Sequence, residues 1–176
     1  SGVTEVEKRA VIDSAEHAGA KDVWLIHEPM AAAIGIGIDV LEPKGNMVID
    51  IGGGTTEIAV ISLGGIVCDK SIRVAGDEFT NNIQTYMKTR HNIAIGDIMA
   101  ENIKIHCGSA LTELEDPPAN YAVHGRDLMS GIPKEVIVTY KEIAGALNNS
   151  IEQIEEAIMN ALLNTPPALS ADIYNE

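Results

Sequence analysis

Residues 50–57 read DIGGGTTE and lie between two apolar runs, residues 47–49 (MVI) and 58–61 (IAVI). A strand that ends in Asp50, breaks into three glycines and resumes as a second strand predicts a hairpin with a bare turn. Glycine reaches positive φ without steric cost, so we expect consecutive amides to point at one anion, with the hydroxyls of Thr55 and Thr56 beside them. Such an anion would need a cation between itself and Asp50, and phosphate with Mg²⁺ fits. A glycine-rich turn that binds nothing is the simpler alternative.

Composition excludes several classes of protein. The chain has 176 residues, is 45% hydrophobic and 22% charged, and is long enough for one domain or a domain with a subdomain. A formal net charge of −14 argues against nucleic-acid binding. Cys68 and Cys107 have no metal or disulfide spacing, which favours a reducing cytoplasm. No apolar run reaches the roughly 20 residues of a membrane-spanning helix, so we expect no transmembrane segment in this chain.

The order of the expected elements predicts an α/β fold. Capping boxes at residues 4–7 (TEVE) and 139–142 (TYKE) open two of the helices. Helices are expected at residues 4–18, 28–35, 77–91 (with Asp77 as N-cap), 97–106 and 139–164, and strands at residues 23–26, 47–51, 57–63, 66–74, 121–124 and 135–140. We interpret this as a mixed sheet flanked by helices, with residues 76–138 as a small α+β subdomain inserted into a core of residues 1–75 and 139–176.

The DIGGGTTE motif resembles the second phosphate loop of the actin-like ATPase superfamily, whose domains have a ribonuclease H-like fold. With residues 25–35 (LIHEPMAAAIG) it closely resembles the MreB family of bacterial actins, and the similarity covers nearly the whole chain. This resemblance implies the second domain of a two-domain ATPase. It also implies a first domain before residue 1, and a further strand with an adenine loop after residue 176.

The resemblance assigns roles to eight residues. Glu28 would position the water that attacks a γ-phosphate, with the Thr55 hydroxyl beside it, and Asp50 would hold Mg²⁺ through metal-bound water. The β- and γ-phosphates would lie against Gly52, Gly53, Gly54 and Thr55, and the nucleoside against Glu101 and Lys104.

From the residues alone, simpler interpretations stay open. Glu28 suits the N-terminus of a helix, Asp50 suits a turn, and Glu101 with Lys104 at i and i+3 suits a surface ion pair. The apolar stripe of residues 143–162 suits core packing better than a filament interface.

For the whole protein, the resemblance implies a cytoskeletal ATPase that binds Mg-ATP between two domains and polymerises head to tail with itself. Its filaments would control cell shape and guide the cell-wall elongation machinery, in the cytoplasm at the inner face of the membrane. The alternatives are a non-polymerising ATPase, either chaperone-type or a small-molecule kinase, and a structural module whose glycine turn binds nothing. We expect the isolated chain to be inactive.

Overall fold

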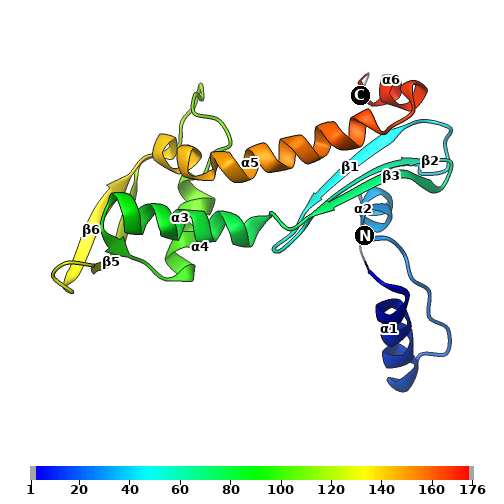
Figure 1. Cartoon of the computed structure of the whole chain (residues 1–176), viewed down its shortest axis with the longest axis horizontal. Helices are drawn as coiled ribbons and strands as arrows, with labels where there is room; N and C mark the ends of the chain where they lie inside the picture. Colours follow the sequence, from blue (N-terminus) through cyan, green and yellow to red (C-terminus); the bar gives the residue numbers. More distant parts are fainter. Residues whose placement is uncertain (1–2, 175–176) are drawn as a thin grey trace. The chain divides into compact units, whose positions relative to one another are not determined.

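The computed structural model describes residues 3–174, which form two compact units (Figure 1). Unit 1 comprises residues 3–51, 56–72 and 157–174, and unit 2 comprises residues 52–55 and 73–156. The outermost residues of the expected core segments, 1–2 and 175–176, lie outside the described residues. The proposed subdomain boundaries near residues 76 and 138 stay a prediction.

Unit 1 begins with α1 (Glu5–His17), and its predicted capping box is confirmed. The Glu7 amide donates to the Thr4 hydroxyl at 3.3 Å, and the Thr4 amide donates to the Glu7 carboxylate at 2.7 Å. These reciprocal bonds satisfy amides that a helix start otherwise leaves unpaired. Gly19 then takes a φ of +99°, the left-handed conformation expected just after the helix.

The strand predicted at residues 23–26 is wrong. These residues belong to no strand, and Trp24 is 91% exposed. An apolar segment becomes a strand only when a neighbour pairs with its amides and carbonyls, and no strand among residues 3–174 does so. The following helix α2 (Glu28–Gly35) is confirmed, with Pro29 in its first turn, where a missing amide proton costs nothing.

The sheet of unit 1 consists of β1 (Asn46–Ile51), β2 (Thr56–Ser62) and β3 (Gly65–Ile72), paired in that order and antiparallel. Every residue of β2 is buried, because both faces of the sheet are covered. Figure 1 shows α2 against one face, where Ala33 packs on β1 and β2. The last turns of α5 (Tyr140–Leu163) cover the other face, with Ala157 and Ala161 on Ile58.

The C-terminal helix α6 (Pro167–Tyr174) was not predicted. The expected stop at residues 165–167 does end α5, but Pro167 also suits the first turn of a new helix. The Gly45 amide donates to the Asp172 carboxylate at 2.9 Å, which ties α6 to the start of β1.

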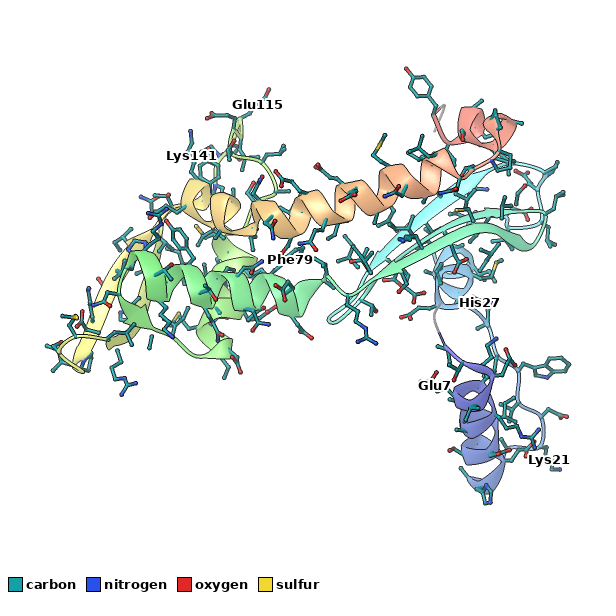
Figure 2. All side chains as sticks on the ribbon, viewed as in Figure 1. Glu7, Lys21, His27, Phe79, Glu115 and Lys141 are labelled. Carbon is teal, nitrogen blue, oxygen red and sulfur yellow. The ribbon has the colours of Figure 1, made fainter. Side chains whose placement is uncertain are left out.

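Unit 2 contains α3 (Gly76–Arg90), α4 (Asp97–Cys107) and an antiparallel sheet of β4 (Ile93–Ala94), β5 (Tyr121–Asp127) and β6 (Pro133–Val138). The helices, the sheet and the first turns of α5 enclose one apolar core, against which Phe79 of α3 packs (Figure 2). All strand pairs in both sheets are antiparallel. The expected mixed sheet would also contain parallel pairs, and none forms among residues 3–174.

Two predicted boundaries in unit 2 are corrected. The strand expected at residues 135–140 ends at Val138, because the capping box of Thr139 and Glu142 starts α5 there, and the Thr139 amide donates to Glu142 at 2.9 Å. Asp77 is not the N-cap of α3. That position is Ala75, which makes no side-chain cap, and Asp77 lies in the first turn, where the helix dipole favours a carboxylate.

No helix among residues 3–174 is long and apolar enough to cross a bilayer.

Candidate functional site

The glycine loop, residues 52–55, joins β1 to β2 and belongs to unit 2 (Figure 1). It closes through a 2.9 Å hydrogen bond from the Gly52 amide to the Thr55 carbonyl. The expectation of positive φ is wrong, since none of Gly52, Gly53 and Gly54 takes a left-handed conformation. Space favours glycine at Gly52, where a Cβ would lie 3.3 Å from the Thr55 carbonyl oxygen, whereas a Cβ on Gly53 would meet the Asp77 carboxylate at an ordinary distance of 3.5 Å.

The first turn of α3 is bonded to this loop. The Gly76 amide donates to the Gly52 carbonyl at 3.1 Å, and the Asp77 amide donates to the Gly53 carbonyl at 2.8 Å. Amides of a first helical turn have no partner inside the helix, so the loop carbonyls satisfy them. All four loop residues are exposed, which leaves their other side open to a ligand. The buried Thr56 is at 0% exposure within β2, so of the two expected hydroxyls only that of Thr55 is accessible.

A cavity of about 520 Å³ opens beside α3 and α4. Its volume lies within the range of about 300 to 1,000 Å³ that is usual for small-molecule sites. The lining side chains come from the exposed faces of the two helices: Asp77, Thr80, Asn81, Asp97, Ile98, Glu101 and Asn102. Of the residues assigned to the nucleoside, Glu101 lines this cavity.

Glu101 and Lys104 form the ion pair that their spacing predicts, with 2.6 Å between Glu101 Oε2 and Lys104 Nζ. The pair is more than a surface contact. Lys104 Nζ also donates to the Gly76 carbonyl at 3.1 Å and to the Thr80 hydroxyl at 3.2 Å. A hydrogen bond from Lys104, and to a smaller extent one from Thr80, holds the pKa of Glu101 below its ordinary value. This carboxylate is therefore ionised at neutral pH.

Glu28 and Asp50 belong to unit 1. Glu28 is the first residue of α2, directly after His27 (Figure 2). It lines a cavity of about 460 Å³, together with the apolar side chains of the N-terminal segment and a group of charged or polar residues, Lys8, His27, Glu57 and Asp69. Asp50 is half-buried near the end of β1, directly opposite Glu57 on β2. Unit 1 thus places the carboxylates of Glu28, Glu57 and Asp69 around one cavity, and Asp50 is not among the residues that line it.

The sequence-based prediction overlooked much of the cavity beside α3 and α4. Residues 77, 80 and 81 share one face of α3, and residues 97, 98, 101 and 102 share one face of α4. Helical spacing of three or four residues from Asp77 and from Glu101 was the available signal. It was missed because the side chains on these faces are common surface types with no distinctive motif.

Comparison with known proteins identifies the family. A profile described as MreB/Mbl protein matches residues 1–176. The chain belongs to the MreB/Mbl family. One MreB/Mbl relative, the cell shape-determining protein Mbl of Bacillus subtilis, is 44% identical over 175 residues, which are 99% of this chain and 52% of that protein. The cell shape-determining protein MreB of Escherichia coli K12 is 46% identical over 172 residues, 98% of this chain and 49% of that protein.

Solved MreB structures confirm the fold. The crystal structure of MreB5 of Spiroplasma citri bound to ADP matches with a TM-score of 0.93 and 41% identity, covering 98% of this chain and 52% of MreB5. The same protein bound to AMPPNP matches equally well, with a TM-score of 0.93. The MamK filament matches with a TM-score of 0.72 at 18% identity, which shows the actin-like fold alone. The chain spans about half the length of the relatives it matches.

Proposed function

We propose that this chain is the second-domain part of a bacterial actin-like ATPase that binds Mg-ATP between two domains and forms filaments controlling cell shape and wall synthesis. The supporting observation is the continuity, within unit 2, of the exposed glycine loop, the first turn of α3 and the cavity beside α4. A bare loop next to a nucleoside-sized cavity suits a ligand with a phosphate end and an organic end. The solved MreB5 relatives bind ADP and AMPPNP, which are ligands of that kind.

Within this proposal the phosphates lie against the loop. Gly52, Gly53 and Gly54 offer backbone without side chains, and the exposed Thr55 hydroxyl adds a donor beside the γ-phosphate. Glu101 and Lys104 belong to the nucleoside side of the site. The Glu101 carboxylate is ionised and 46% exposed, so it can accept hydrogen bonds from the hydroxyls of a ribose.

The residues present also fit Mg²⁺. No group of three or more His, Cys, Asp or Glu among residues 3–174 could hold a metal ion by itself. Mg²⁺ bound with nucleotides needs no such cage, because it keeps several waters and takes ligands from the phosphates and one or two carboxylates. Asp50, half-buried near the end of β1, is the carboxylate we assign to it, acting through metal-bound water. The ion would offset the negative charge of the phosphates.

Glu28 is assigned to the attacking water. At the first turn of α2 its carboxylate is favoured by the helix dipole and lines a cavity in unit 1. Hydrolysis of a phosphoanhydride depends on positioning and charge, so a carboxylate that orients water is a sufficient role. The Thr55 hydroxyl would assist from the loop.

The protein would lie in the cytoplasm at the inner face of the membrane, bound to further copies of itself and to the wall elongation machinery.

The test is Glu28→Ala in the full-length protein that contains this chain. We expect ATP hydrolysis to slow by about a hundredfold or more while the Kd for ATP stays unchanged, because the residue acts on water and not on the nucleotide. Glu16→Ala, which removes an exposed carboxylate from α1, is the matched control. Loss of ATP binding in Glu28→Ala would contradict the assignment and give Glu28 a structural role.

The isolated chain offers a second check. Because the relatives are about twice as long, we expect the chain alone to bind ATP weakly and to hydrolyse it negligibly. Turnover by the isolated chain equal to that of the full-length protein, measured as phosphate release, would contradict a site shared between two domains.

A further inference from the structure

The two oxygens of the Glu101 carboxylate have different surroundings. Oε2 lies 2.6 Å from Lys104 Nζ and 3.0 Å from the Thr80 hydroxyl. Within residues 3–174, Lys104 and Thr80 are the partners of this carboxylate, and both contacts are made to Oε2. The protein thus holds one oxygen, which leaves Oε1 as the acceptor for a ligand in the cavity that Glu101 lines.

The Thr80 hydroxyl completes a ring of contacts with Lys104 and Glu101. Lys104 Nζ donates to this hydroxyl at 3.2 Å. Its single proton has two acceptors within reach, Glu101 Oε2 and the Gly76 carbonyl, each at 3.0 Å. The carboxylate is ionised and is therefore the stronger acceptor, and the Gly76 carbonyl already accepts from Lys104 at 3.1 Å. The proton of Thr80 therefore goes to Glu101.

We propose that Thr80 is a positioning residue, which fixes the Glu101 carboxylate so that Oε1 accepts a hydrogen bond from a ribose hydroxyl. The inference rests on the proposed function, since it concerns the nucleoside side of that site, to which Glu101 and Lys104 belong. A lysine ammonium is a compact charge with rotatable donors, so Lys104 attracts the carboxylate without fixing its rotation. A second donor, from α3, fixes that rotation before the ligand binds. Thr80 therefore sets how strongly the site prefers a ribonucleotide to a deoxyribonucleotide.

Titration of the Glu101 carboxylate by ¹³C NMR, in the full-length protein without nucleotide, tests the positioning itself. Hydrogen bonds from Lys104 and from Thr80 hold the pKa of Glu101 below its ordinary value. In Thr80→Val, which keeps the side-chain shape but removes the donor, the midpoint should rise toward that ordinary value, and Thr80→Ser should restore it.

Thr89→Val is the matched control for this titration. Thr89 is exposed on α3, and its hydroxyl donates to the Thr85 carbonyl at 2.8 Å. This variant removes a threonine hydroxyl from the same helix and should leave the Glu101 midpoint unchanged. An unchanged midpoint in Thr80→Val would overturn the proposal.

Comparison of ATP with 2′-deoxyATP and 3′-deoxyATP tests the preference for a ribonucleotide. Wild type should bind the analogue that lacks the hydroxyl held by Glu101 about tenfold or more weakly than ATP. In Thr80→Val this ratio of Kd values should fall to about threefold or less, and Thr80→Ser should restore it. Equal Kd values for ATP and both analogues in wild type, or a wild-type ratio in Thr80→Val, would overturn the proposal.

Glu101→Ala separates positioning from direct contact, since Thr80 and Glu101 both line the cavity. A residue that acts through Glu101 has no effect once that carboxylate is absent, so adding Thr80→Val to Glu101→Ala should leave the Kd for ATP unchanged. A further loss as large as that in Thr80→Val alone would overturn the proposal and make Thr80 a direct ligand of the nucleotide.

The measurements also separate this inference from the proposed function. A wild-type protein that does not bind ATP refutes the proposed function. The titration of Glu101 needs no nucleotide, so it still decides whether Thr80 positions the carboxylate.

Discussion

Gly53→Ala separates a phosphate-binding loop from a simple turn. Gly53 does not take a left-handed conformation, and the added Cβ would lie 3.5 Å from Asp77 Oδ1, an ordinary van der Waals distance. The folded protein therefore accepts the methyl group without strain. Alanine also restricts the unfolded chain, so the free energy of unfolding should change by between zero and a gain of about 1 kcal/mol.

The effect on binding should have the opposite sign. The methyl group would stand between the loop backbone and an approaching phosphate. Loss of one hydrogen bond to a charged group costs about 1.5–3 kcal/mol, which corresponds to a Kd for ATP that is roughly tenfold to 150-fold higher. A loop that binds no ligand predicts no change in Kd.

The assay is calorimetric titration of full-length Gly53→Ala with Mg-ATP, together with thermal unfolding of the ligand-free protein. Gly145→Ala is the matched control: Gly145 is exposed within α5 and has open space around its Cβ position. This control should gain about 1 kcal/mol of stability from helix propensity and keep the wild-type Kd. A wild-type Kd in Gly53→Ala, with normal folding, would refute the assignment of this loop to phosphate.

Two further predictions concern stability. Burial raises the pKa of Glu142, but hydrogen bonds from Thr139 and Tyr86 outweigh it and hold the pKa below its ordinary value of 4.5. The ionised carboxylate therefore stabilises the fold above about pH 4.5, and this contribution is lost as the pH falls through the folded pKa of Glu142. In urea unfolding, Glu142→Gln should therefore lose less stability on acidification than wild type does. An equally steep acid loss in the variant would exclude this carboxylate as a source. Ile58→Ala, at a position with 0% exposure in β2, should lower the free energy of unfolding by about 2–5 kcal/mol, whereas Ile36→Ala, at 73% exposure, should change it by less than about 0.5 kcal/mol. Equal losses in these two variants would contradict the burial of β2 between α2 and α5.

Local signals in the sequence predicted most of the elements. Both capping boxes form as expected, since each depends only on residues three positions apart. The glycine hairpin, α2 and the two helices after the hairpin also follow from local spacing and from glycine or proline at their ends. These features succeed because their hydrogen bonds close within a few residues.

Features that depend on distant partners were predicted less well. Residues 23–26 have the composition of a strand but lack a neighbour among the described residues. β4 pairs with β5 over only two residues, too short a run to show a periodic pattern. In the candidate site, the motif indicated the loop and the family resemblance indicated Glu101. The contact of Lys104 with Gly76 joins residues 28 positions apart, and only the folded unit reveals it.

Light scattering of the full-length protein on addition of Mg-ATP, with phosphate release followed in the same sample, tests the central claim most directly. A filament-forming ATPase of the MreB/Mbl family predicts scattering that rises only above a critical protein concentration, with phosphate release following the rise. Phosphate release or phosphotransfer without any rise in scattering would contradict the account and favour a non-polymerising ATPase or a kinase.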